Sequence, residues 1–255
     1  MSRPRHSEAW LRSFHDARPG LTSAALAATD SYSRLVATVS ARSRILDLGC
    51  GDGHLGTLLA RDGVIGVDVS RGEATLARAR GVRVVQARAS ELPFAAGAFD
   101  AAVSHLAFLL FDDVEAVVAE LARVLVPGGT FAATLGGGPV AGEEEDDDAF
   151  HAFLALLARL ARLARPASPR LGDPRARSEA GWRELFAGWR ELAFARHVVE
   201  LADFDAAWSF LGASYELAAT DADAIRHDLA AWWRAHPDRR RCRIVTWLAT
   251  VRRPG

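Results

Sequence analysis

The chain has 255 residues, half of them apolar, and a formal net charge of −1 at pH 7. This length can bury one full α/β core, and the lack of a basic surplus argues against binding a nucleic-acid backbone. All 31 basic residues are arginines, so lysine chemistry is excluded and proton transfer falls to other side chains.

Cysteine usage and the termini indicate the compartment. Cys50 and Cys242 are too few for a disulfide framework, which is typical of a reducing cytosol. The N-terminus is polar, without the apolar region of a signal peptide. The apolar run 106–111 is far shorter than the ~20 residues of a membrane span, and no other run approaches that length. We therefore expect a soluble, cytoplasmic protein with no membrane partner.

The first half of the chain alternates between strand-like and helix-like segments. Residues 1–40 have the spacing of one or two amphipathic helices, interrupted at Arg18-Pro19-Gly20. From residue 44, short apolar runs alternate with helical patterns, which predicts a parallel sheet with helices on both faces. The predicted strands are 44–48, 64–68, 82–86, 99–104 and 130–135, and the predicted helices are 54–61, 71–80 and 113–124.

The second half is less regular. Gly136-Gly137-Gly138-Pro139 is expected to break the chain, and the acidic run from Glu143 to Asp148 is expected to be solvated at the start of a helix. Ser178 is placed to cap a helix that begins at Glu179. Segment 136–180 is interpreted as a lid-like insertion and 203–236 as a second insertion. The other predicted elements are a helix over 149–165, a strand over 194–201, helices over 205–218 and 221–235, and a strand over 243–251.

A glycine-rich loop, residues 47–53, follows the first predicted strand. Glycines there let the backbone pass close to a ligand. Residues 51–56 match the dinucleotide string G-x-G-x-x-G, but the Asp47 carboxylate would repel a pyrophosphate. The same carboxylate suits an ammonium group. Asp68 ends the second strand and could accept hydrogen bonds from ribose hydroxyls in either class of cofactor, or could cap the following helix.

Three segments in order resemble class I S-adenosylmethionine-dependent methyltransferases of the methyltransferase-11-like, small-molecule type. They are Ile45-Leu-Asp-Leu-Gly-Cys-Gly-Asp-Gly53, Ser90-Glu-Leu-Pro-Phe94 followed by Phe99-Asp100, and Glu120-Leu-Ala-Arg-Val-Leu-Val-Pro-Gly-Gly129. The resemblance implies one Rossmann-like domain over 1–255, with a doubly wound seven-stranded sheet of order 3-2-1-4-5-7-6 and an antiparallel strand 7. N-terminal helices would occupy 1–40, the cofactor-binding core 41–135, and substrate-side insertions and closing strands 136–255.

The resemblance also implies roles for individual residues around S-adenosylmethionine. The expected cofactor-binding positions are Asp47, Gly49 and Gly51 at the methionine moiety, with Cys50 as a packing residue of the same loop, Asp68 at the ribose, Val69 on the adenine face, Ala89, Ser90 and Glu91 at the adenine edge, and Ser104 and Leu106 near the transferred methyl.

Arg88 departs from the family pattern, which often has an acidic residue there that accepts from the adenine amino group. Arginine has donors only. Backbone groups around Ala89 and Ser90 are therefore expected to hold the adenine.

Methyl transfer from a sulfonium needs mainly alignment and exclusion of water. His105, directly after the fourth strand, is the candidate catalytic residue that positions or deprotonates the acceptor; the alternative is a pocket-lining histidine. His54 is interpreted as helix packing. The aromatic residues that would wall an acceptor pocket, or else form core, are Trp208, Phe210, Tyr215, Trp232 and Trp233.

The sequence thus predicts O-, N- or C-methylation of a small organic acceptor, with S-adenosylhomocysteine as product. No metal and no nucleic-acid partner is expected, and the protein would be a monomer or homodimer. Two alternatives stay open: cyclase or hydrolase chemistry on the same fold, and a non-catalytic cofactor-binding module. A nicotinamide-dependent dehydrogenase is disfavoured by Asp47.

Overall fold

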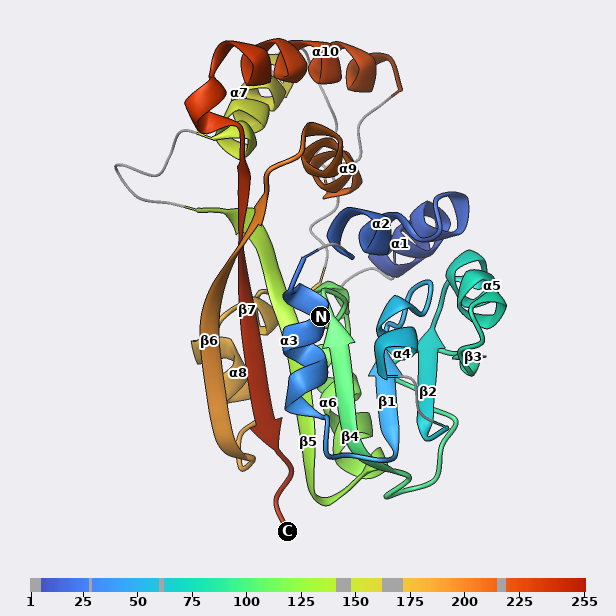
Figure 1. Ribbon diagram of the computed structural model, residues 1–255. Helices are drawn as coiled ribbons and strands as arrows, with labels where there is room; N and C mark the ends of the chain where they lie inside the picture. The colour runs from blue at the N-terminus through green and yellow to red at the C-terminus, as the bar shows by residue number, and fades with distance from the viewer. Residues whose placement is uncertain (1–5, 28, 60–61, 141–147, 162–171, 215–218) are drawn as a thin grey trace.

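The computed structural model describes residues 6–27, 29–59, 62–140, 148–161, 172–214 and 219–255. These residues form a seven-stranded sheet of order β3-β2-β1-β4-β5-β7-β6 (Figure 1). Strands β1 to β5 are parallel, and β7 is antiparallel to its neighbours β5 and β6. The predicted fold class, strand order and antiparallel seventh strand are confirmed. The strands are β1 (Ile45–Leu48), β2 (Val64–Asp68), β3 (Val84–Gln86), β4 (Phe99–His105), β5 (Leu125–Pro139), β6 (Arg190–Leu201) and β7 (Cys242–Arg252).

Different helices cover the two faces of the sheet. Ile45 belongs to one buried apolar cluster and its neighbour Leu46 to the other, so successive strand residues serve opposite faces. Strands covered on both sides are apolar throughout, which explains the continuous runs in the sequence. The covering helices are α3 (Ser31–Thr38) and α4 (His54–Leu59) on one face and α6 (Val114–Val124) and α8 (Glu179–Leu185) on the other, with α5 (Arg71–Ala79) beside β2 and β3.

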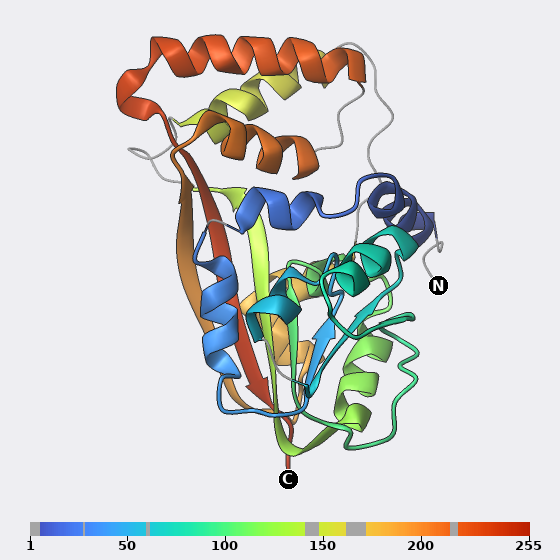
Figure 2. The ribbon, with the colours of Figure 1, turned by 45° about the vertical axis from the view of Figure 1, so that its right-hand side comes forward.

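The N-terminal segment forms three helices rather than one or two. The predicted break is confirmed, because α1 (His6–Ala17) ends before Gly20, whose φ of 80° is left-handed, and α2 (Leu21–Leu26) begins directly after it. Helix α1 lies beside α5 (Figure 2). The N-terminus therefore approaches the carboxyl end of the sheet, where ligands bind in open α/β folds.

The expected break at residues 136–139 is wrong. Strand β5 continues to Pro139 because β7 pairs with it, Gly136 opposite Thr246 and Gly138 opposite Val245, with a bulge between the two glycines. A partner strand far along the chain thus overrides the local turn signal.

Asp148, expected to be solvated, is fully buried. Its carboxylate accepts hydrogen bonds from the backbone N–H of Phe150 (3.0 Å) and of Arg243 (2.8 Å), which joins the start of α7 (Ala149–Ala161) to β7. The rest of the acidic run, 143–147, lies outside the described residues. So do 162–165 of the helix predicted over 149–165, and 141–147 and 162–171 of the predicted lid.

Three helices form a layer beyond the end of the sheet (Figures 1 and 2). They are α7, α9 (Phe204–Ser214) and α10 (Ala219–Ala235), and α9 also packs on α2. Ser178 is the N-cap of α8, as predicted: its hydroxyl accepts from the backbone N–H of Gly181 at 3.1 Å. None of the helices in the described ranges is long and apolar enough to cross a membrane.

Candidate active site

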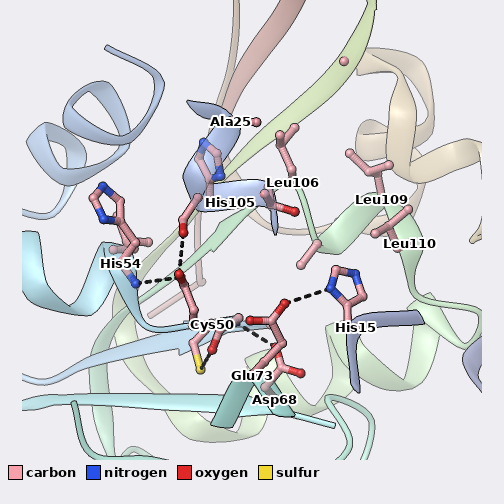
Figure 3. A pocket seen from close by; sticks show the side chains of 18 of the residues that line it. His15, Ala25, Cys50, His54, Asp68, Glu73, His105, Leu106, Leu109 and Leu110 are labelled. Atoms are coloured by element: carbon pink, nitrogen blue, oxygen red, sulfur yellow. Dashed lines mark hydrogen bonds and ion pairs between the residues drawn. The ribbon is translucent and has the colours of Figure 1, made fainter. Parts of the chain in front are cut away.

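A cavity of about 510 Å³ lies at the carboxyl ends of β1, β2 and β4 (Figure 3). The glycine loop forms one wall, and residues of α1, α2 and the end of β5 form others. A second cavity, about 110 Å³, shares Asp68, His15 and Leu11 with the first. A ligand with a polar end and a flat end can therefore extend past Asp68 from one cavity into the other.

The glycine loop folds back over β2. The backbone N–H groups of Gly49 and Cys50 both donate to the carbonyl of Val67, at 2.8 and 3.0 Å. Gly49 has a φ of 70°, and a Cβ there would lie 2.4 Å from the Cβ of Ala107, so only glycine fits. Cys50 is buried against Gly66, the packing role predicted for it, and lines the larger cavity.

Asp47 is 1% exposed at the end of β1 and lines the larger cavity. Its Oδ2 has no hydrogen-bond partner among the described residues. Burial, reinforced by the nearby charges of Asp68 and Asp52, raises the pKa of Asp47 to about 8. A buried carboxylate without a partner is costly, and a ligand ammonium group would satisfy it.

Asp68 joins the glycine loop to the start of α5. Its Oδ2 accepts from the backbone N–H of Gly51 and its Oδ1 from that of Ser70, both at 2.8 Å. The N-cap of α5 is Ser70, which accepts from Glu73, so the alternative that Asp68 caps this helix is wrong. Each carboxylate oxygen has a second lone pair, so Asp68 can still accept from ribose hydroxyls.

The smaller cavity contains most of the predicted adenine residues. Val69, Ala89 and Ser90 line it. Glu91 does not: it is exposed, outside the cavity walls that the described residues form, and its backbone N–H donates to the carbonyl of Arg88 in a turn. Arg88 itself lines this cavity.

Ser104 and Leu106 differ in their relation to the cavity. Ser104 is fully buried, and its hydroxyl donates to the carbonyl of Leu48 (2.8 Å) and accepts from the backbone N–H of Phe108 (3.0 Å). Ser104 thus connects the end of β1 to the backbone after β4 and is not among the described residues that line either cavity. The prediction that it lies near the transferred methyl is therefore wrong. Leu106 does line the larger cavity, with a φ of 55° that is uncommon for a residue with a Cβ.

His105 lies in the wall of the larger cavity (Figure 3) and is 8% exposed. Its ring stacks on Tyr32, with centroids 3.7 Å apart, and its Nε2 is 3.2 Å from the hydroxyl of Ser31. Burial, and to a lesser extent His54, lowers the pKa of His105 to about 3, so the imidazole is neutral. His54 packs edge-on against Tyr32, with ring centroids 4.7 Å apart, and also lines the cavity.

Sequence reasoning missed Tyr32, Glu73 and the cavity-facing side of α1. Glu73 is buried and accepts from His15 Nδ1 and from the backbone N–H of Gly20, both at 2.9 Å. An acidic residue in the first turn of a helix ordinarily needs no further explanation, and nothing local distinguishes this one.

Of the five aromatic residues predicted to wall an acceptor pocket or else to form core, Phe210 lines the larger cavity. Trp208, Trp232 and Trp233 pack within the layer of α7, α9 and α10. Tyr215 lies outside the described residues.

Comparisons with known proteins agree with this geometry. Residues 46–133 match the methyltransferase domain family. The demethylmenaquinone methyltransferase of Thermus thermophilus is 41% identical over 104 residues, 37% of this chain and 47% of that protein. The fatty-acid O-methyltransferase of Mycolicibacterium smegmatis is 34% identical over 96 residues, 34% of this chain and 35% of that protein. The chain thus spans less than half the length of these relatives.

The crystal structure of the YcgJ protein of Bacillus subtilis shares the fold, with a TM-score of 0.57 at 23% identity, covering 88% of this chain and 98% of that one. The family match, the strand order and the acidic residues around the glycine loop lead to one conclusion. Residues 46–133 resemble a methyltransferase domain in sequence, and the sheet that they belong to has the strand order expected for class I S-adenosylmethionine-dependent methyltransferases.

Proposed function

We propose that this protein transfers the methyl group of S-adenosylmethionine to a small organic acceptor. The observation that carries the proposal is Asp47, whose buried Oδ2 has no hydrogen-bond partner among the described residues and is therefore available to a ligand cation. It would hold the ammonium group of the cofactor, and Asp68 would hold the ribose. When bound, S-adenosylmethionine supplies an activated methyl group and leaves as S-adenosylhomocysteine.

The charges of the site favour this cofactor over a dinucleotide. Four carboxylates, from Asp47, Asp52, Asp68 and Glu73, line the larger cavity. Asp52 and Glu73 are paired with Arg80 and His15. Asp68 and, once it is ionised, Asp47 would repel a pyrophosphate, whereas they attract a cationic sulfonium with an ammonium group. The same acidic residues thus support S-adenosylmethionine and oppose NAD.

The part of the cavity away from the glycine loop is mostly apolar. Leu106, Leu109, Leu110 and Phe210 line it together with the glycines of β5, residues 136–138. Apolar walls around a few polar groups are typical of sites for small organic ligands. The acceptor therefore has an apolar body and a nucleophilic atom that reaches His105.

A chain of hydrogen bonds behind His105 fixes its tautomer. The hydroxyl of Thr29 donates its one proton to the carbonyl of Leu26 at 2.7 Å, so it accepts from the hydroxyl of Ser31 at 2.9 Å. Ser31 has then used its own proton and accepts from His105 Nε2. Because the ring is neutral, Nδ1 is left as an acceptor, and it has no partner in the described part of the chain.

We therefore assign His105 to holding the acceptor by a hydrogen bond to Nδ1. A nitrogen with a pKa of about 3 is a weak base, so positioning is favoured over full removal of a proton. We expect H105A to lower kcat/KM by about tenfold or more, with S-adenosylhomocysteine affinity within about twofold. H105Q keeps an N–H donor for Ser31 but lacks Nδ1, so its kcat/KM should fall by a similar factor. A kcat/KM that stays within twofold in both variants would remove this role.

Thermal unfolding with S-adenosylmethionine, S-adenosylhomocysteine and NAD tests the cofactor. A ligand at about 100 times its Kd stabilises the folded state by roughly 2.7 kcal/mol, so the two sulfur compounds should raise Tm and NAD should not. An acceptor screen with methyl-labelled S-adenosylmethionine then tests transfer. Binding followed by conversion of a substrate without label transfer would instead favour the cyclase or hydrolase alternative, and binding without turnover of any substrate would favour a non-catalytic module.

We also propose a cytoplasmic location and a small-molecule partner. Cys50 and Cys242 are both buried free thiols, as a reducing compartment favours. Four acidic residues line the larger cavity against one arginine, Arg177, and this balance disfavours a phosphate backbone.

A further inference from the structure

An ion pair joins α1 to the turn after β3 at the smaller cavity. Arg88 Nη2 lies 2.6 Å from Glu8 Oε2, and both side chains line this cavity. They are 38% and 30% exposed, so each is partly withdrawn from solvent. Arg88 cannot itself accept a hydrogen bond from the adenine amino group, but it contacts a carboxylate that can, that of Glu8 on α1.

We propose that Glu8 accepts the hydrogen bond from the adenine amino group, and that Arg88 is a positioning residue that holds the Glu8 carboxylate at the cavity. One carboxylate oxygen contacts Arg88, which leaves lone pairs on the other oxygen for a donor. This inference rests on the proposed cofactor. It replaces the prediction that backbone groups alone hold the adenine.

The shape of the smaller cavity suits a flat base. Val69, Ala89, Leu110, Phe111 and Val117 give it apolar walls, and Asp68 lies where it meets the larger cavity. A nucleoside whose ribose is held by Asp68 would therefore extend its base toward Glu8 and Arg88.

Helix geometry places Glu8 at this position. Glu8, Leu11 and His15 are spaced i, i+3 and i+7, so they share one face of α1. All three line the smaller cavity, and His15 is anchored to Glu73 at 2.9 Å. The contact at His15 therefore sets the rotation of α1 that brings Glu8 to the cavity.

Besides Glu8 and the ribose-side Asp68, two acidic residues line the smaller cavity, Asp112 and Asp113, and both are exposed. Asp113 accepts from the backbone N–H of Ala116 at 3.3 Å as the N-cap of α6. Asp112 precedes it on the same exposed turn. Glu8 is the more buried carboxylate and has a cation to orient it, so it is the better acceptor for a base.

The test compares S-adenosylhomocysteine with S-inosylhomocysteine, in which an oxygen replaces the adenine amino group, by calorimetry. In the wild type the amino form should bind about tenfold more tightly, because the oxygen would face the Glu8 carboxylate. E8Q should weaken S-adenosylhomocysteine about tenfold and largely remove this selectivity, since its amide can donate to the oxygen. R88M should act in the same direction, and E8Q/R88M should lose little more than E8Q alone.

D205N is the matched control, because it breaks the exposed Asp205–Arg226 pair (2.8 Å) between α9 and α10. It should bind both ligands as the wild type does, and the Tm of each variant reports its folding. If E8Q keeps the affinity and the selectivity of the wild type, backbone groups read the adenine and the inference is overturned. If the wild type binds neither ligand, the cofactor proposal fails first and this inference with it.

Discussion

At the residue scale, Asp47 faces opposite demands in the free and the ligand-bound protein. Its pKa is raised to about 8 in the fold, from an ordinary 3.8, so the folded state holds a proton that the unfolded state has lost between these values. Stability therefore falls as pH rises through this window. We predict that D47N raises the free energy of unfolding at neutral pH by about 1–3 kcal/mol, yet weakens S-adenosylhomocysteine binding more than tenfold. Urea unfolding and calorimetry measure the two effects.

D100N is the control of opposite sign. Hydrogen bonds from Arg44 lower the pKa of Asp100 to about 2, so its charge stabilises the fold and is lost only as pH falls toward that value. D100N should lower stability at neutral pH and leave ligand affinity unchanged. A loss of stability in D47N as well would contradict the account given for Asp47.

Which site residues the sequence identifies depends on whether their signal is local. Asp47 and Asp68 end strands beside a glycine loop, so the chemistry and its position are encoded in a few neighbouring residues. Glu8 and Tyr32 reach the cavities only through tertiary packing of α1 and α3. The predicted role of Ser104 near the transferred methyl is wrong because its hydroxyl forms hydrogen bonds with backbone groups, and the sequence does not distinguish such a residue from one that binds a ligand.

At the element scale, the glycines of β5 give a test of the acceptor space. A Cβ on Gly138 would meet no heavy atom within 4 Å, although this residue lines the larger cavity. We predict that G138L keeps Tm and S-adenosylhomocysteine affinity but lowers kcat/KM by about tenfold, most strongly for large acceptors. Thermal unfolding, calorimetry and steady-state kinetics with acceptors from the screen measure these quantities. Equal losses of cofactor affinity and turnover would place Gly138 at the cofactor instead.

G136A shows what the same strand does not tolerate. Gly136 has a φ of 105°, and a Cβ there would lie 2.6 Å from the carbonyl oxygen of Val245. This substitution should cost about 1–3 kcal/mol of stability.

The sequence predicts a break at this run of glycines, because the strand that pairs with it, at Val245 and Thr246, is more than a hundred residues away and leaves no local signal. The elements from 44 to 124 were predictable because each has its own apolar periodicity.

At the scale of the whole molecule, α1 closes one side of both cavities. His15 is bound to Glu73, and Asp16 accepts from the Ser70 hydroxyl (2.7 Å) and from the backbone N–H of Gly72 (2.9 Å). Trp10, Leu11 and Phe14 of the same helix line the larger cavity. A cofactor bound there would contact α1, so binding and docking of this helix should stabilise each other.

The docking of α1 should therefore depend on pH and on ligand. Burial alone would lower the pKa of His15, but the hydrogen bond and charge of Glu73 outweigh it, so the pKa is raised above its ordinary 6.5. The contribution of this pair is complete below the ordinary value and is lost as pH rises through the folded one. In free protein, we predict that tryptic cleavage after the exposed Arg12 of α1 accelerates with rising pH, relative to cleavage after Arg226 on α10.

The ratio to Arg226 cancels the pH dependence of trypsin itself. S-adenosylhomocysteine should slow cleavage after Arg12 at every pH, because bound ligand favours the docked helix. H15A should abolish the pH dependence and speed ligand dissociation several-fold, since the Asp16 hydrogen bonds would remain but the His15–Glu73 contact would be lost. If S-adenosylhomocysteine binds and yet leaves the cleavage ratio unchanged, α1 does not cover the site in solution, and the His15–Glu73 pair stabilises the fold without controlling access.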